Sequence, residues 1–213
     1  MLDLVLPLQC GGCGAPGIRW CDACAGSLAV RIDDPHLVAP RSDPGVPVFS
    51  LGRYAGPRRH AIVATKEHGR ADLIVPLAAA LAAGLNRLID WRVVRPPLTV
   101  VPAPTRRWAA RRRGGDPVTR MAVAATAGRA DLAVVAALRT RALVADSVGL
   151  SGAARQRNIA GRVKVVRTLP GRAVGEVVLV DDIVTTGATI CESVRMLHAA
   201  GARVAAVLTV AHA

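Results

Sequence analysis

The segment from residue 177 to residue 189 constrains the fold of this chain more than any other part of the sequence. Its first four residues, Val177–Val180, are all apolar, which is typical of a strand buried on both faces of a sheet. The acidic pair Asp181-Asp182 comes next, and Thr185–Thr189 then leads into an alanine-rich helical pattern. A strand, a turn and a helix in this order predict one unit of a parallel α/β sheet.

The chain from Val48 onward repeats this alternation of strand-length apolar runs and helical patterns. The runs predict strands at Leu98–Val101, Val134–Leu138, Val177–Val180 and Val204–Val210. The predicted helices are Ile74–Leu88, a segment opened by Asp116-Pro117, and Ala188–Ala200. Aspartate caps free amides and proline suits a first helical turn, while Gly201 provides the stop of the last helix.

Three regions of the chain differ in composition. Residues 1–30 contain four of the five cysteines, residues 31–47 are rich in proline and charge, and residues 48–213 carry the alternating pattern. We therefore expect a small N-terminal cysteine module, a linker and one α/β domain. A chain of 213 residues, 52% of them hydrophobic, can bury a core of this size.

The turn after Val177–Val180 has the chemistry of a phosphate site. Small residues let the backbone approach an anion, and the next helix offers free amides and the positive end of its dipole. Carboxylates repel phosphate, so the acidic pair must face sugar hydroxyls or a magnesium ion. Phosphate, diol and metal together favour a ribose phosphate, held by Asp181, Asp182, Thr185, Thr186, Gly187, Ala188 and Thr189. A Walker-type nucleotide loop is excluded, because no glycine-rich run ends in Gly-Lys-Ser/Thr.

Four cysteines near the N-terminus form two Cys-x-x-Cys pairs separated by seven residues: Cys10, Cys13, Cys21 and Cys24. Each pair can place two thiolates on one metal, and two pairs complete a tetrahedral zinc site. Such a site is structural, because no coordination position stays open. The alternative is two disulfides, which a cytoplasmic chain would not keep oxidised.

The charge balance permits polyanionic ligands without identifying one. The chain has 28 basic and 15 acidic side chains, a net charge of +13. Its first eight residues lack the basic leader and the length of a secretory signal, and no uninterrupted apolar stretch reaches the length of a membrane span. We therefore expect a cytoplasmic protein without a membrane span.

Here the residues match a known family. Val177–Thr189 closely resembles the phosphoribosyl-pyrophosphate signature of type I phosphoribosyltransferases. With its four-cysteine start, the chain resembles the ComF family of competence-associated and gluconate-utilisation-associated phosphoribosyltransferase-like proteins. The family's Val-Pro-x-Pro, Tyr-x-Gly with Leu-Lys, and Gln-x-Gly-Leu with Arg and Asn elements are similar to Val100–Pro104, Tyr54–Gly56 with Lys66, and Asp146–Leu150 with Arg155 and Asn158. This sequence departs from the family at Gly115-Asp116-Pro117, where Phe-Asn-Gln is common, and at Ser147, where glutamine is usual.

The resemblance implies a type I phosphoribosyltransferase fold with a zinc module, structural Zn²⁺, and Mg²⁺ bound together with phosphoribosyl pyrophosphate. It implies that Asp181 and Asp182 contact the ribose hydroxyls as catalytic residues and that Thr185–Thr189 holds the phosphate. The pyrophosphate would lie near Val101, Pro102 and Ala103, with Lys66 directed at the phosphates and a lid formed by Arg106, Arg107, Arg111, Arg112 and Arg113. A helix surface for Lys66 and a solvated basic loop for the arginines are the alternatives.

Three functions stay open at this point. The first is an enzyme that moves ribose phosphate onto an unidentified acceptor and releases pyrophosphate. The second is a non-catalytic ribose-phosphate sensor or adaptor, which the sequence does not separate from the first. The third is a protein that handles single-stranded DNA during uptake. The charge permits nucleic acid, but the five aromatic residues are scattered, and base stacking needs them on one face.

Overall fold

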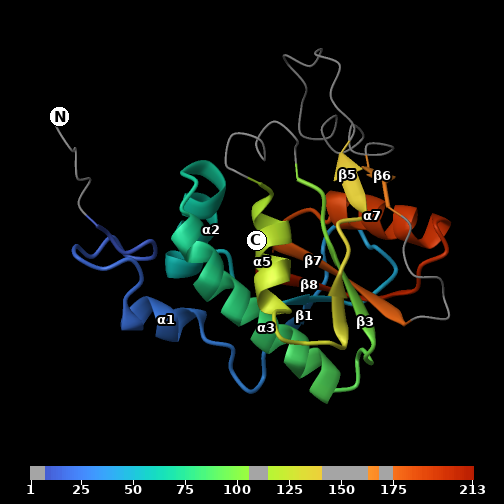
Figure 1. The fold of residues 1–213 in the computed structure, drawn as a ribbon, viewed down its shortest axis with the longest axis horizontal. Coiled ribbons are helices and arrows are strands. Elements are labelled where there is room, and N and C mark those ends of the chain that lie inside the picture. The colour runs from blue at the N-terminus through green and yellow to red at the C-terminus, as the bar shows by residue number, and fades with distance from the viewer. Residues whose placement is uncertain (1–7, 106–114, 141–162, 168–174) are drawn as a thin grey trace, which may run out of the picture.

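The computed structural model describes residues 8–105, 115–140, 163–167 and 175–213 (Figure 1). Within these residues, six strands form one sheet in the order β1-β2-β8-β7-β3-β4. Their bounds are β1 (His36–Val38), β2 (Val48–Ser50), β3 (Leu98–Pro102), β4 (Leu132–Val134), β7 (Glu176–Val184) and β8 (Val204–His212). Strands β2, β8, β7, β3 and β4 pair in parallel, and β1 joins the edge antiparallel to β2.

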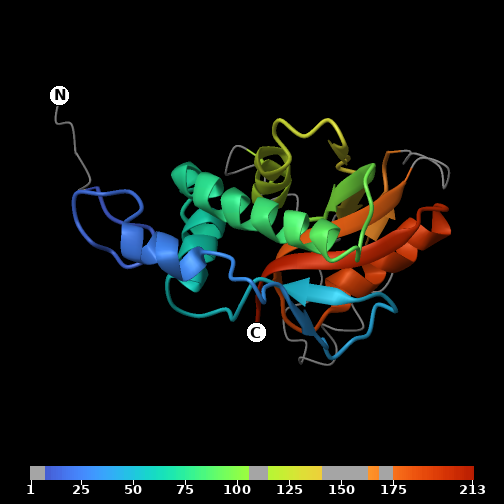
Figure 2. The same ribbon diagram turned by 90° about the horizontal axis from the view of Figure 1, so that it is seen from below.

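Helices cover both faces of this sheet (Figure 2). One face packs against α2 (Gly56–Glu67), η1 (Ala71–Leu73), α3 (Ile74–Asp90) and α5 (Pro117–Ala125). The other face packs against α7 (Ala188–Ala199) and a small antiparallel pair, β5 (Leu138–Thr140) and β6 (Val163–Val165). The mostly parallel sheet between two helical layers confirms the predicted α/β class.

Two predicted helix ends are confirmed by their hydrogen bonds. The side chain of Asp116 accepts from the amides of Val118 and Thr119 at the start of α5. At the end of α7, Gly201 has a φ of +82° and its amide donates to the carbonyl of His198. Both features depend on neighbouring residues, which is why the sequence pattern was sufficient to place them.

The strand predicted at Val134–Leu138 is wrong in extent. β4 ends at Val134, and the amide of Ala137 donates to the carbonyl of Val135 at 2.7 Å. This tight turn takes the chain out of the main sheet, and Leu138 begins β5 in the second sheet. A continuous apolar run does not reveal such a turn, because its two halves pack in different cores and both are apolar.

Strand β7 is longer than predicted and includes the acidic pair. β8 continues beside it, so that Asp181 pairs with Thr209 and Ile183 pairs with Ala211. The carboxylates therefore project from a strand rather than from the turn that follows. Val184 is the last residue of the strand.

The N-terminal residues form a small module beside α2 and α3. It contains α1 (Asp22–Leu28), and Leu28 joins the core that those helices share. Residues 31–47, which the sequence predicts to be a linker, contain β1 and so add an edge strand to the sheet.

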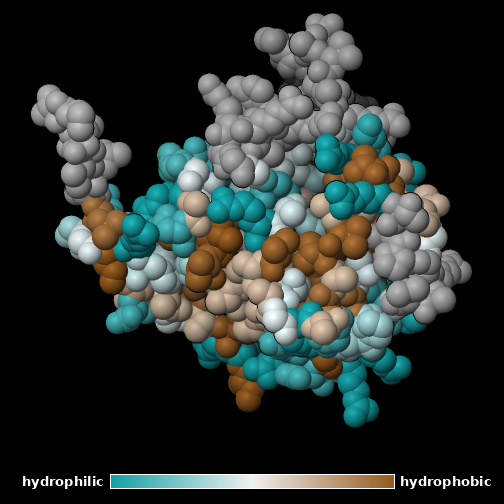
Figure 3. All heavy atoms as spheres, viewed as in Figure 1, coloured by the Kyte–Doolittle hydropathy of each residue, from teal (hydrophilic) through white to brown (hydrophobic). Residues whose placement is uncertain are grey.

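One helical stretch, Ala71–Asp90, is long and apolar enough to cross a membrane by length and composition. Half of its apolar window is buried inside the protein, where Leu77, Leu81 and Leu85 face the sheet core. Figure 3 shows apolar residues gathered over the face that carries α3 and α5, with hydrophilic residues around them. These features are those of a core helix, so the described residues contain no clear membrane span.

Candidate functional site

The end of β7 carries the two acidic side chains in different surroundings. Asp181 is half-buried, whereas Asp182 is only 2% exposed. The next residues, Thr185 and Thr186, are exposed, and Gly187 then caps the N-terminus of α7 with a left-handed φ of +83°. The first amides of a helix have no partner within that helix, so this turn can offer donors at the carboxyl edge of the sheet. The first of them, the Ala188 amide, donates to Oγ1 of Thr186 at 3.5 Å.

Asp181 lies just beyond the point where β7 stops pairing with β3. The amide of Ala103 donates to the carbonyl of Val180, and β3 has ended by this point. The Asp182 amide donates to Oδ1 of Asp181 at 2.8 Å instead of to a strand. Burial, and then the charge of Asp182, raise the pKa of the Asp181 carboxyl well above its usual value. A cation or hydroxyl donor at this carboxylate would relieve that unfavourable charge.

Asp182 is paired with a lysine from α2. Nζ of Lys66 lies 2.8 Å from both Oδ1 and Oδ2 of Asp182. Burial opposes the charge on Lys66, but the Asp182 carboxylate outweighs it and raises the lysine pKa. The sequence predicts that Lys66 contacts phosphates, and that contact stays a prediction; the structure gives the lysine a carboxylate partner that no local sequence signal indicates.

The segment after β1 packs onto the turn between β7 and α7. The Ser42 amide donates to the Thr186 carbonyl at 2.9 Å. A side chain at position 187 would place its Cβ 2.7 Å from the Ser42 carbonyl oxygen and 2.8 Å from Cβ of Pro40. Sequence reasoning missed Pro40 and Ser42 as neighbours of the site, because the contact joins segments far apart in the chain.

A pocket of about 400 Å³ lies beside this turn. Its lining includes Val38, Pro40, Arg41, Val184, Thr185 and His212. It therefore lies at the carboxyl ends of β7 and β8, where parallel α/β sheets bind ligands. Burial, and then the nearby Arg53 and His36, lower the pKa of His212, so this imidazole is neutral at neutral pH.

The residues predicted to lie near a pyrophosphate are only partly described. Val101, Pro102 and Ala103 are buried at the end of β3, directly beside Val180 of β7. The lid predicted at Arg106, Arg107, Arg111, Arg112 and Arg113 lies outside the described residues, as do Asp146–Leu150, Arg155 and Asn158.

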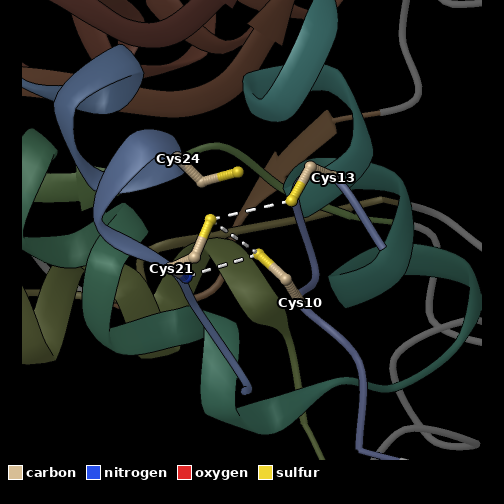
Figure 4. A group of neighbouring side chains, drawn as sticks. All are labelled: Cys10, Cys13, Cys21 and Cys24. Carbon is tan, nitrogen blue, oxygen red and sulfur yellow. Dashed lines mark hydrogen bonds between the residues drawn. The ribbon is translucent and has the colours of Figure 1, made fainter. Parts of the chain in front are cut away.

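The four N-terminal cysteines converge, as Figure 4 shows. The Sγ atoms of Cys10, Cys13, Cys21 and Cys24 all lie within 4.8 Å of one another, and the thiols are free. Sγ of Cys21 is 3.7 Å from that of Cys10 and 3.6 Å from that of Cys13. A tetrahedral zinc with Zn–S bonds of about 2.3 Å separates its sulfurs by about 3.8 Å. The four cysteines therefore fit a structural zinc ion.

The backbone around these sulfurs is shaped for a compact site. Gly14 has a φ of +81°, and its amide donates to the carbonyl of Cys10, which closes the first turn. Burial opposes ionisation of Cys10, but hydrogen bonds from the amides of Cys13, Gly12 and Cys21 lower its pKa to about 6. Burial, and then hydrogen bonds with the other thiols, raise the pKa of Cys24. A bound cation would release the remaining thiol protons, so metal affinity should rise with pH.

Purified protein is expected to contain about one zinc per chain, because four thiolates form a closed site for one ion. Cys13→Ser should lose that zinc and loosen the N-terminal module, while the main sheet stays folded. Elemental analysis of chelator-free preparations is the measurement. Cys191→Ser, on α7, is the matched control and should keep the metal. Equal zinc content in both variants would contradict the assignment.

The fold and the β7–α7 turn define an α/β protein with a ligand site at the carboxyl edge of its parallel sheet. The family model described as the phosphoribosyl transferase domain matches residues 119–213, slightly less than half of the chain. The match begins within α5 and ends after β8, so it includes the acidic pair and the whole turn. This part of the chain is similar to a phosphoribosyl transferase domain, and the similarity supports a place in the type I superfamily. A comparison with curated proteins finds no match.

Proposed function

We propose that this protein binds phosphoribosyl pyrophosphate at the β7–α7 turn and transfers its ribose phosphate to an acceptor. The observation that carries the proposal is the open end of β7. A half-buried carboxylate, Asp181, lies there a few residues before a turn with exposed threonines and free helix amides. These groups can bind the diol and the phosphate of one sugar, and the family match supports the same chemistry.

In the proposed complex, the amides and hydroxyls of Thr185–Thr189 hold the sugar phosphate. Asp181 accepts hydrogen bonds from the ribose hydroxyls and is the residue that would hold Mg²⁺. The metal would neutralise the charge of the departing pyrophosphate. The backbone at Val101, Pro102 and Ala103 borders the side from which the pyrophosphate leaves, because the end of β3 lies beside Val180.

The reaction breaks the bond between the anomeric carbon and the pyrophosphate oxygen, and the acceptor forms a new bond to the same carbon. The proposed contribution of the protein is to fix the sugar, stabilise the leaving group and exclude water. The pocket beside Thr185, lined also by the neutral imidazole of His212, is where we place the acceptor.

The finer assignment is a ComF-like protein. Its support is the combination of a four-cysteine module with a phosphoribosyl transferase domain in one chain. The location that goes with this proposal is the cytoplasm.

Calorimetry with phosphoribosyl pyrophosphate and Mg²⁺ tests the proposal. We expect binding with a dissociation constant of about 10 μM to 1 mM, and weaker binding of inorganic pyrophosphate, which lacks the sugar that Asp181 recognises. Release of pyrophosphate in a panel of bases and amines then identifies the acceptor. Absence of binding at millimolar ligand would falsify the ribose-phosphate assignment.

A further inference from the structure

Lys66 forms an ion pair with only one of the two adjacent acids, Asp182. Its ammonium contacts both carboxylate oxygens of Asp182, whose side chain is only 3% exposed. Asp182 is therefore committed to an internal partner. Within the described residues, Oδ1 of Asp181 accepts a hydrogen bond from the Asp182 amide. The lysine thus keeps the buried negative charge neutralised and leaves Asp181 to meet the ligand.

Helix α2, which carries Lys66, is held at its middle by the cysteine module. Nδ1 of His60 lies 2.6 Å from the carbonyl oxygen of Gly12, which is between the first two cysteines. Just after α2 in the chain, Nη2 of Arg70 donates to the carbonyls of Gln9 and Arg19. A Cβ on Gly11 would overlap the side chain of Leu73, so the first cysteine turn packs closely on η1. The module therefore contacts α2 at His60 and the segment between α2 and α3 at Arg70 and Leu73.

We infer that the four-cysteine module positions the ligand site through α2, by holding this helix where Lys66 can bind Asp182. The inference rests on the proposed binding of a ribose phosphate at Asp181. In it, Lys66 is a positioning residue, because it acts on the ligand through the acidic pair. Loss of metal from the module should then move α2 and, through Lys66, change the sugar selectivity at the end of β7.

The first test compares ribose 5-phosphate with 2-deoxyribose 5-phosphate, because the proposed contact of Asp181 with the sugar includes the hydroxyl that the deoxy sugar lacks. The wild-type protein should prefer the ribose form. Lys66→Met should reduce this preference by about tenfold, Lys66→Arg should restore part of it, and His60→Ala should reduce it by about threefold. His68→Ala, an exposed histidine at the end of the same helix, is the matched control and should change nothing.

The double variant His60→Ala with Lys66→Met decides whether the module acts through the lysine. If it does, the double variant should have the same sugar preference as Lys66→Met alone, because the lysine that His60 helps to place is already gone. Strictly additive losses in the double variant would overturn the inference. So would a normal sugar preference in Lys66→Met.

Hydrogen exchange of the full chain gives a readout that needs no sugar. Removing zinc with a chelator should speed exchange of α2 amides while β7 and β8 stay protected. Unchanged exchange in α2 would also overturn the inference. If the wild-type protein binds neither sugar phosphate, the proposed function fails, and the exchange experiment still decides whether the module holds α2.

Discussion

Gly187→Ala is expected to weaken phosphoribosyl pyrophosphate binding by about 100-fold, equivalent to about 2.7 kcal/mol. The left-handed backbone at this position disfavours a side chain, which costs about 1 kcal/mol. The new Cβ would also lie within 3 Å of Ser42 and Pro40. To relieve that contact, the turn or the segment 40–42 must move, and either movement displaces the free amides of α7. Calorimetry and urea unfolding measure the two effects.

Gly201→Ala is the matched control for this prediction. Gly201 follows the other end of α7 and has almost the same φ, +82°, but a Cβ there would meet no atom within 4 Å. It should lose about 1 kcal/mol of stability and keep its ligand affinity. If the two variants bind equally well, the close contact with the segment 40–42 does not shape the phosphate site. The sequence indicates that small residues in this turn let the backbone approach an anion. In the structure, a side chain at position 187 would instead meet Ser42 and Pro40.

Asp181→Asn is expected to lose ribose-phosphate affinity by about 10- to 100-fold, because hydrogen bonds to a charged group are worth about 1.5–3 kcal/mol. The same change should stabilise the unliganded protein at neutral pH by about 0.5–1 kcal/mol, since it removes a buried charge beside Asp182. A site residue that costs stability in this way is expected where function requires a half-buried carboxylate to meet a ligand.

The pH dependence distinguishes this effect from a general change in packing. Because folding raises the pKa of Asp181, the folded protein binds this proton more tightly than the unfolded chain. Its contribution to stability is therefore fully present below about pH 4 and is lost as pH rises through the folded pKa. Asp181→Asn should remove this decrease of the free energy of unfolding with pH. The variant should therefore become more stable than the wild type only as pH rises. A constant difference from pH 4 to pH 8 would contradict this explanation.

Asp182→Asn should behave differently from Asp181→Asn. On sequence grounds both acids are expected at a solvent-facing strand end, so that a double asparagine variant should keep the fold. The structure corrects this prediction for Asp182, because it is buried against Lys66. Losing its charge leaves the partly buried ammonium without a counter-ion and should cost about 1–3 kcal/mol.

The elements that were predicted well are those whose signals are local. The buried core of β7, the cap at Asp116 and the stop at Gly201 each depend on a few neighbouring residues. The break after Val134 was missed, because an apolar run has the same pattern whether it stays in one sheet or turns into another.

The chemical groups present at the candidate sites can be read from the amino-acid sequence alone. The spacing of Cys10, Cys13, Cys21 and Cys24 predicts one metal site, and the residues from Asp181 to Thr189 predict a phosphate turn beside two acids. The difference between the two acids becomes visible in the folded chain. Burial and ion pairing depend on what packs against a side chain, and Lys66, Pro40 and Ser42 reach the site from distant parts of the chain. Such partners leave no periodicity or spacing in the segment that they contact, because chain folding alone brings them there.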